Sequence, residues 1–428
     1  MNTLNRTQAP EFKTIDKITI QQAQSFTLDN GIQVYTIDAG SQELTRIEFI
    51  FKAGMYYQDT PLVASAACAL IENGTAKYSA NQLSDSIDFY GSFFETSVTQ
   101  DFSSLALFSL NKHLESTLVF IEELIKNAIY PQEEINTYLT NKKQKFLVSS
   151  QKVDVLARRK YSELLFGKTH PYGLEVKAED HDTTKRDSIV NFFKKYYTHG
   201  NCTIVVAGKL PANLQQVLNN HFGKDKWGVA TNIDKAYTPA QTTTQNIHYI
   251  EKPDAVQSAI RMGRRLFNKT HPDYFAFQVL NTILGGYFGS RLMANIREDK
   301  GYTYGIGSGL ASLVHDGYFF ISTEVGADVT KNTLQEVYKE IEIMQNDLVS
   351  EDELETVKNY ILGQFLRSVE GPFALADKFK GIWEFGLNYS YYDNYFNAVK
   401  SVTSQQIRDL TDKYLQKKDL IELVVGKK

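Results

Sequence analysis

The chain has 428 residues, of which 42% are hydrophobic and 22% are charged, and its formal net charge is −4. This composition is typical of a globular protein, and the length allows two domains because single hydrophobic cores rarely exceed about 250 to 300 residues. Dispersed Lys and Arg argue against a nucleic-acid partner. Two cysteines exclude a disulfide framework, and the lack of long apolar runs argues against a signal peptide or a membrane span. A cytoplasmic location is expected.

The first half of the chain is expected to hold a polar N-terminal arm (1–24) and an α+β domain (25–222). The domain is predicted to open with a hairpin whose turn is Asn30-Gly31, a pair favoured in two-residue hairpin loops. Alternating and helical apolar periodicities predict the elements that follow. They are a strand at 44–53, helices at 62–72 and 79–90, strands at 92–99 and 102–110, helices at 112–127, 132–166 and 184–197, and a strand at 201–207.

The second half is expected to consist of a linker (223–245) and a second domain (246–428). The linker is polar, rich in Thr and poor in apolar periodicity. The domain is predicted to contain strands at 246–251 and 256–266, helices at 273–284 and 290–300, a hairpin of 302–313 with 317–325, helices at 331–345, 351–369, 373–385 and 404–414, and a strand at 420–425.

The second half repeats the element order of the first. A shift of about 210 residues superimposes the two orders, with Gly91 and Gly301 preceding equivalent hairpins. The final strands also match, because one reads VVAG (205–208) and the other VVG (424–426). The sequence therefore predicts a duplicated α+β domain.

The stretch Gly285–Gly309 carries a candidate binding corner. Ser290 is predicted to cap a short helix that ends at Gly301 in a left-handed conformation, and a strand is predicted after it. Arg297 then lies in the last helical turn and Tyr304 on the strand. A guanidinium and a phenol at such a corner can hold the carbonyl or carboxylate oxygens of a peptide. The alternative is an Arg stacked on a Tyr or paired with a neighbouring carboxylate at the surface.

Four phrases together resemble the M16 metallopeptidases, the family of pitrilysin and the mitochondrial processing peptidase. They are TLDNG (27–31), NGT (73–75), HPYG (170–173) and SRLMANIREDKGYTYGIGS (290–308). The resemblance covers nearly the whole chain after the arm. It implies two homologous α+β domains, each a mainly antiparallel sheet with helices packed on one face.

The chain departs from this family at the metal site. Active members carry the inverted motif His-x-x-Glu-His, whose histidines bind zinc and whose Glu acts as general base. The equivalent positions here include Ser65, Cys68 and Ala69, which cannot replace that set. No catalytic residue and no zinc site are therefore expected in this chain. Cys68, flanked by alanines, is expected to be a small buried hydrophobe rather than a reactive thiol.

Some members of the family consist of two chains, of which only one carries zinc. The other supplies an Arg and a Tyr seven positions apart, as are Arg297 and Tyr304 here. The resemblance therefore implies a non-catalytic, substrate-binding subunit whose partners are a zinc-bearing M16 sister chain and a peptide. Tyr302 is a weaker candidate, and Gly305, Gly307 and Gly309 are interpreted either as room for a peptide at the strand edge or as close helix packing. A structural or assembly subunit like the core proteins of the respiratory bc1 complex, and a stand-alone peptide-binding protein, including a homodimer, remain alternatives.

Overall fold

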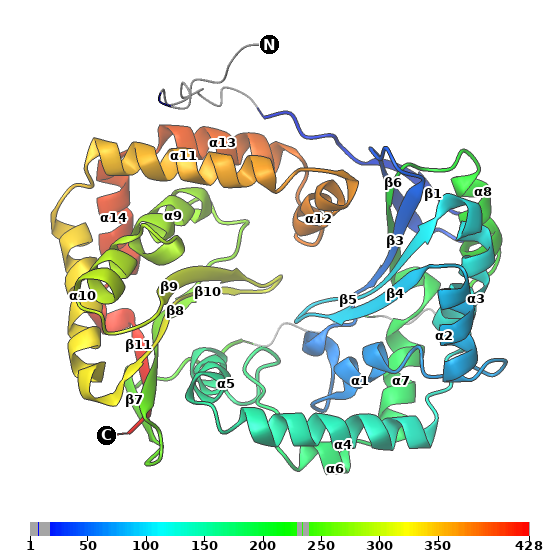
Figure 1. Cartoon of the computed structure of the whole chain (residues 1–428), viewed down its shortest axis with the longest axis horizontal. Helices are drawn as coiled ribbons and strands as arrows, with labels where there is room; N and C mark the ends of the chain where they lie inside the picture. Colours follow the sequence, from blue (N-terminus) through cyan, green and yellow to red (C-terminus); the bar gives the residue numbers. More distant parts are fainter. Residues whose placement is uncertain (1–6, 8–17, 229–232, 234–238, 428) are drawn as a thin grey trace.

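The computed structural model describes residues 7, 18–228, 233 and 239–427. Most of the predicted arm (1–24) and the middle of the predicted linker (223–245) therefore lie outside the described residues. Within the described part of the chain, no helix has both the length and the apolar character that crossing a bilayer requires. Two sheets, one from each half of the chain, stand on opposite sides of the molecule with helices packed against them (Figure 1).

The first sheet has six strands in the order β1-β2-β6-β3-β5-β4. Its strands are β1 (Gln24–Thr27), β2 (Gln33–Asp38), β3 (Leu44–Phe51), β4 (Phe93–Val98), β5 (Ser103–Leu110) and β6 (Cys202–Gly208). The helices of this half are α1 (Val63–Ala69), α2 (Ala80–Phe89), α3 (Leu114–Asn127), α4 (Gln132–Ser149), α5 (Val153–Phe166), α6 (Asp180–Thr183), α7 (Arg186–Tyr196) and α8 (Leu214–Leu218).

The second sheet has five strands in the order β7-β11-β8-β10-β9. Its strands are β7 (Ile247–Glu251), β8 (Gln257–Leu266), β9 (Ile306–Ser312), β10 (Gly317–Gly326) and β11 (Ile421–Gly426). The helices are α9 (Tyr274–Asn281), α10 (Thr330–Asn346), α11 (Glu351–Arg367), α12 (Pro372–Trp383), α13 (Ser390–Ser401) and α14 (Ser404–Tyr414), with π-helical turns η5 (Thr282–Gly286) and η6 (Met293–Asp299).

The two sheets share one topology. The order β2-β6-β3-β5-β4 in the first sheet corresponds to β7-β11-β8-β10-β9 in the second, and β1 is an additional edge strand. In each set of five, the first pair is parallel (β2 with β6, β7 with β11) and the other pairs are antiparallel. Gly91 (φ +61°) and Gly301 (φ +65°) both adopt the left-handed conformation before the equivalent hairpins. The predicted fold class, two homologous α+β domains with mainly antiparallel sheets, is confirmed, but helices cover both faces of each sheet rather than one.

Alternation along the strands explains why both faces of each sheet are covered. In the second sheet, Ile260, Phe319 and Ile321 belong to the core formed with the helices of that half. Residues of the opposite face, such as Ala259 and Leu423, belong instead to a cluster that contains side chains of α5. Because successive strand residues point to opposite faces, each sheet requires apolar cover on both sides.

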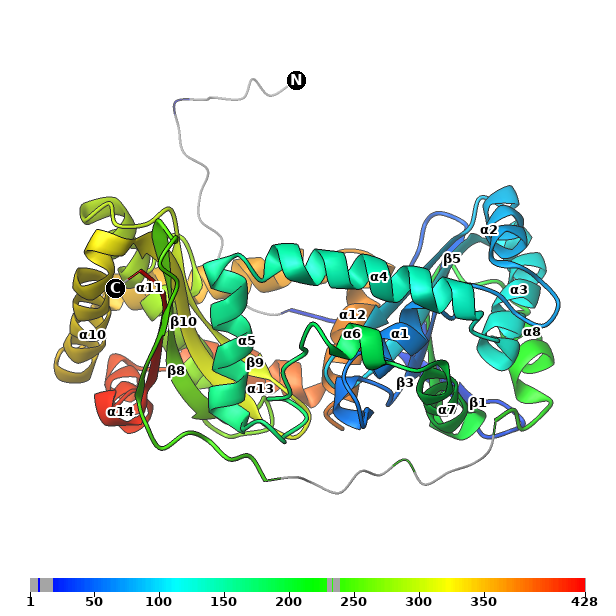
Figure 2. The same ribbon diagram turned by 90° about the horizontal axis from the view of Figure 1, so that it is seen from below.

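The halves exchange one helix each. Helix α5, within the range 25–222 predicted for the first domain, packs on β8 and β11 of the second sheet. Helix α12 of the second half packs on β2 and β6 of the first sheet, where Ala376 and Phe379 contact a cluster that includes Val205. Figure 2 shows α4 running between the halves and ending beside α5.

Two sequence predictions for the first half are wrong in detail. A single helix was expected over 132–166, but the chain turns between α4 and α5. The hydroxyls of Ser149 and Ser150 both donate to the Phe146 carbonyl, and Arg159 donates to both hydroxyls. The Asn30-Gly31 pair lies in a five-residue connection (28–32) rather than a two-residue turn, since Thr27 pairs with Gln33.

The tips of the equivalent hairpins meet between the halves. Asp101, at the β4–β5 turn, accepts hydrogen bonds from the Tyr172 hydroxyl (2.5 Å) and from the backbone N–H of Val314, at the β9–β10 turn (3.1 Å). Burial raises the pKa of the Asp101 carboxyl. The ring of His315 lies 4.4 Å from that of Tyr56, so the contact is aromatic as well as polar.

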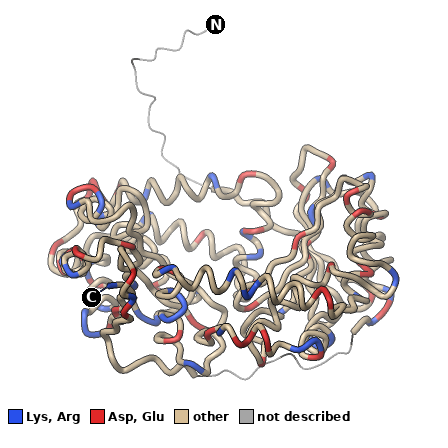
Figure 3. The backbone as a smooth tube through the Cα atoms, turned by 60° about the horizontal axis from the view of Figure 1, so that its bottom comes forward, with Lys and Arg blue, Asp and Glu red and all other residues tan. Residues whose placement is uncertain are grey.

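A buried charge network holds α12 against the first sheet. The Glu48 carboxylate, whose side chain is 4% exposed, accepts a 2.7 Å hydrogen bond from Lys380 Nζ and lies 3.5 Å from the Arg46 guanidinium. Arg46 also donates to Asp377 at 2.7 Å. The charges of two residues on β3 and two residues on α12 thus neutralise one another at the contact between the halves. Figure 3 shows acidic and basic positions distributed over both halves.

Candidate functional site

The corner at Gly285–Gly309 forms a short helical segment followed by a sharp stop. The segment is π-helical at η6, and the backbone N–H of Lys300 donates to the Asn295 carbonyl. Gly301 ends it in the predicted left-handed conformation, and the Tyr302 N–H donates to the Ile296 carbonyl. The predicted capping role of Ser290 is wrong, because its hydroxyl is buried without a described partner.

Arg297 lies in the last turn of this segment, as predicted. Its side chain is half-buried, and its guanidinium carbon lies 4.6 Å from the ring centroid of Phe288, which is 62% exposed. It forms no ion pair with any described carboxylate, including its neighbours Glu298 and Asp299. The guanidinium is stacked but not neutralised, which leaves its hydrogen-bond donors available.

Tyr304 lies before the strand and not on it. Strand β9 begins at Ile306, and Tyr304 occupies the preceding turn, where it is 94% exposed. The Thr303 hydroxyl fixes this turn, because it accepts from the Gly305 N–H (3.1 Å) and donates to the Glu324 carbonyl (2.7 Å). The weaker candidate Tyr302 does not lie beside Tyr304 on a strand, and it packs instead against the core of the second half.

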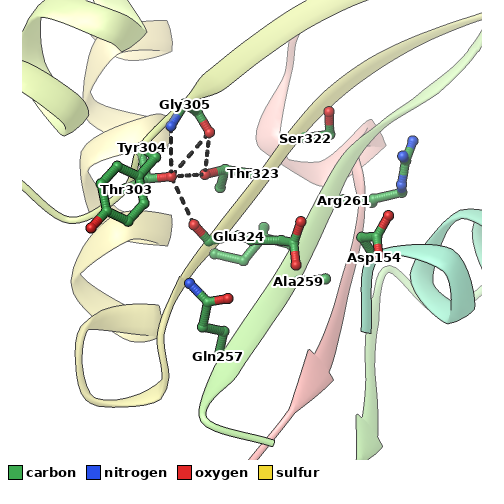
Figure 4. Close-up of a pocket in the computed structure, with 11 residues that line it drawn as sticks. Asp154, Gln257, Ala259, Arg261, Thr303, Tyr304, Gly305, Ser322, Thr323 and Glu324 are labelled. Atoms are coloured by element: carbon green, nitrogen blue, oxygen red, sulfur yellow. Dashed lines mark hydrogen bonds between the residues drawn. The ribbon is translucent and has the colours of Figure 1, made fainter. Parts of the chain in front are cut away.

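A pocket of about 410 Å³ lies beside Tyr304 on the α5-covered face of the second sheet (Figure 4). Its lining comes from the 303–305 turn, β8, β10 and α5. Arg297 is not among the lining residues. The structure thus places Tyr304 at the pocket and Arg297 against Phe288.

Three charged residues of this pocket have no local sequence signal. Arg261, Asp154 and Glu324 come from β8, α5 and β10, and none forms an ion pair with a described residue. Burial, and to a lesser degree the charge of Asp154, raises the pKa of Glu324. Burial lowers the pKa of Arg261. The pocket therefore offers groups of both signs to a polar ligand.

The glycines after Tyr304 allow close packing of neighbouring segments. A Cβ on Gly307 would lie 3.4 Å from the Gly285 carbonyl oxygen, and one on Gly309 would lie 3.0 Å from the Phe320 ring. A Cβ on Gly305 would meet nothing within 4 Å. Close helix packing accounts for Gly307, because Gly285 belongs to η5, whereas Gly309 packs against Phe320 of the neighbouring strand β10, and only Gly305 leaves open space.

The positions that would carry the zinc motif lie on α1. The Ser65 hydroxyl donates to the Leu62 carbonyl at 2.9 Å, and the Cys68 thiol, 1% exposed, donates to the Ser97 carbonyl of β4 at 3.3 Å. Ala69 offers no ligand atom. Among the described residues, no group of three or more His, Cys, Asp or Glu side chains is arranged to hold a metal ion. These residues do not fit a zinc ion.

Comparison with known proteins identifies the family. Residues 183–361 match the model described as the peptidase M16 inactive domain. The chain is 22% identical to the uncharacterized zinc protease YmxG of Bacillus subtilis, over 69% of this chain and 72% of that protein. It is 21% identical to the non-peptidase homolog YmxG of Helicobacter pylori, over 74% of each chain.

The fold is that of a solved peptidase M16 inactive domain from Pseudomonas fluorescens, with a TM-score of 0.84 and 23% identity over 95% of this chain and 99% of that one. The chain thus has the fold of the M16 peptidases and, over 183–361, matches their inactive-domain model. The probable inactive metalloprotease YmfF of Bacillus subtilis is 22% identical over 49% of each chain. This M16 chain is accordingly an inactive, non-catalytic homologue of the M16 peptidases.

Cys68, the thiol at the positions equivalent to the zinc motif, is expected to be chemically unreactive in this M16 chain. Burial raises the pKa of Cys68 to about 11 and also raises the pKa of Cys202. We expect an aromatic disulfide reagent at pH 8 to label both thiols about a hundredfold more slowly in the native protein than in urea, since the thiolate is the reactive form. A Ser84→Cys variant, whose new thiol is exposed on α2, is the positive control. Rapid native labelling without that substitution would contradict the buried assignment.

Proposed function

We propose that this M16 chain is the non-catalytic, substrate-binding subunit of a two-chain zinc endopeptidase that acts on peptides or unfolded segments in the cytoplasm. The observation that carries the proposal is the state of Arg297 and Tyr304. One presents a guanidinium without a described ionic partner, and the other presents a phenol that is 94% exposed beside a pocket. Exposed donors without intramolecular partners are free to bind a ligand, and a guanidinium forms strong hydrogen bonds with carboxylates.

The residues of this chain supply binding and orientation in the proposed complex. Arg297 donates to a carbonyl or carboxylate of the peptide, and Tyr304 donates from its hydroxyl. Zinc, held by the sister subunit, would supply the water-activating chemistry that Ser65, Cys68 and Ala69 cannot provide. Donors placed where negative charge develops stabilise a transition state strongly because they need no reorganisation.

A stand-alone peptide-binding protein is the second candidate. It is favoured by the pocket beside Tyr304, because residues of this chain alone enclose about 410 Å³ on the face of a sheet. A structural or assembly subunit is the third candidate, and in that case Arg297 and Tyr304 would have no effect on any peptide reaction.

Co-expression distinguishes these functions. A tagged form of this chain is purified alone and together with an M16 chain that carries His-x-x-Glu-His, and hydrolysis of a quenched fluorescent peptide and zinc content are measured. We expect no hydrolysis and no stoichiometric zinc for this chain alone, and both for the pair. One tightly bound zinc per chain, or hydrolysis by the lone chain, would overturn the proposal.

The sister chain alone is the necessary control. If the pair forms but cleaves no faster than the sister chain alone, the structural function is supported instead. If this chain binds the uncleaved peptide without any partner and does not stimulate the sister chain, the stand-alone function is supported.

A further inference from the structure

A second pocket, of about 300 Å³, lies on the far side of α12 from the first sheet. It opens between α12, α9 and α13, with one wall from the end of α11. Its rings come from Tyr274, Phe365, Tyr391, Tyr392 and Tyr395, and we call it the tyrosine pocket. None of its lining residues belongs to the corner that carries Arg297 and Tyr304.

Two lysines line the tyrosine pocket without carboxylate partners. Lys269 Nζ donates to the Gly381 carbonyl at 2.9 Å, which uses one of its three donors. Lys378 Nζ lies 5.1 Å from the centroid of the Phe365 ring. Neither ammonium group forms an ion pair with a described residue. Burial lowers the pKa of both, while the charge of Glu384 opposes this effect at Lys269 and the charge of Asp377 opposes it at Lys378.

The phenols of the pocket add neutral donors. The hydroxyls of Tyr391 and Tyr395 have no described hydrogen-bond partner, and burial raises the pKa of both, so they stay protonated at neutral pH. The Tyr392 hydroxyl is already committed, because it donates to the Lys378 carbonyl at 2.7 Å. The carboxylate in the lining, Asp377, binds Arg46 at 2.7 Å.

We propose that the tyrosine pocket binds a carboxylate carried by an apolar or aromatic group. Its free polar groups are mostly donors, two of them cationic, so a carboxylate would satisfy them with charge-assisted hydrogen bonds. Its aromatic rings form apolar walls for the rest of the ligand. Two sources share this chemistry, namely a free organic acid and the C-terminal residue of a peptide.

Calorimetric titration of the full-length chain tests this proposal. The probes are N-acetyl-phenylalanine and N-acetyl-phenylalaninamide, which differ only in the charged group. We expect the acid to bind at least about tenfold more tightly than the amide, because a hydrogen bond to a charged group contributes at least that factor. Lys378→Met keeps the apolar stem over Phe365 and removes the charge, and it should weaken binding of the acid by about tenfold or more.

Further variants keep the test decisive. Tyr395→Phe should weaken binding of the acid without loss of ring packing, and Lys331→Met, an exposed position on α10 without a described partner, should leave it unchanged. Lys378→Met is preferred to a change at Lys269 because the Gly381 contact of Lys269 supports the fold.

A pentapeptide that ends in phenylalanine distinguishes the sources. Binding at least as tight as that of the acid would identify a peptide C-terminus, and binding of the acid alone would identify a small organic acid. Equal binding of acid and amide, no binding of either, or full affinity in Lys378→Met would overturn the proposal.

Discussion

Replacing Arg297 by alanine should lower turnover by the reconstituted two-chain peptidase by about ten- to a thousandfold, and Tyr304→Phe should do the same. This range is typical when an oriented donor to a reacting or anchoring oxygen is removed. Both side chains are exposed or half-buried at a corner whose backbone is fixed by other residues, so the fold should be retained. Steady-state kinetics with a quenched fluorescent peptide measure the effect.

Matched controls separate binding from charge. Arg297→Lys keeps the charge but loses the planar fork, and we expect it to recover only part of the activity. Arg367→Ala removes an exposed arginine from α11 and should be silent. A rise in KM alone would indicate uniform binding of the substrate, whereas equal losses in kcat and kcat/KM would indicate a contact made in the transition state. Wild-type rates in both Arg297→Ala and Tyr304→Phe would show that these two side chains take no part in substrate binding or turnover.

Glu48→Ala should lower the free energy of unfolding by about 3–5 kcal/mol, because it leaves the buried Arg46 and the half-buried Lys380 with too little negative charge. The Glu48 side chain is 4% exposed and faces Arg46 and Lys380, which belong to opposite halves. Urea unfolding measures the change, and hydrogen exchange should show faster opening of α12.

Asp377→Ala is the control for this network. Its carboxylate also binds Arg46 but is 55% exposed, so its loss should cost about 1 kcal/mol or less. Equal destabilisation by the two substitutions would show that burial of Glu48 does not set the strength of the network.

Much of the fold was predictable because its signals are local. Alternating strands, helical apolar spacing and glycines such as Gly91 and Gly301 each act within a few residues. The helices α6, α8 and α13 were not predicted. The longest of them, α13, is rich in Tyr and Asn, which have low helix propensity, although Tyr392, Phe396 and Val399 keep helical spacing. The break before α5 has no Gly or Pro, because it depends on hydroxyl bonds and on docking to the other sheet.

For the candidate site too, local sequence signals could be predicted and tertiary contacts could not. Arg297 and Tyr304 could be proposed from the sequence because their motif is contiguous, whereas their surroundings depend on the tertiary fold. Phe288 under the guanidinium, and the pocket residues Asp154 and Arg261, come from segments that no spacing connects. The predicted strand at Tyr304 failed because Thr303 bonds stabilise a turn that aromatic content alone cannot reveal.

Helix α5 of the first half covers the second sheet and helix α12 of the second half covers the first sheet, and this arrangement has a consequence for the evolution of the chain. After duplication, neither copy remained self-sufficient, since each now completes its sandwich with a helix encoded by the other. Loss of the second copy would expose Ile37, Val205 and Ala207 to water, and such an exposed apolar surface favours aggregation. A shortened descendant would therefore need another helix to cover the first sheet before it could lose the second domain.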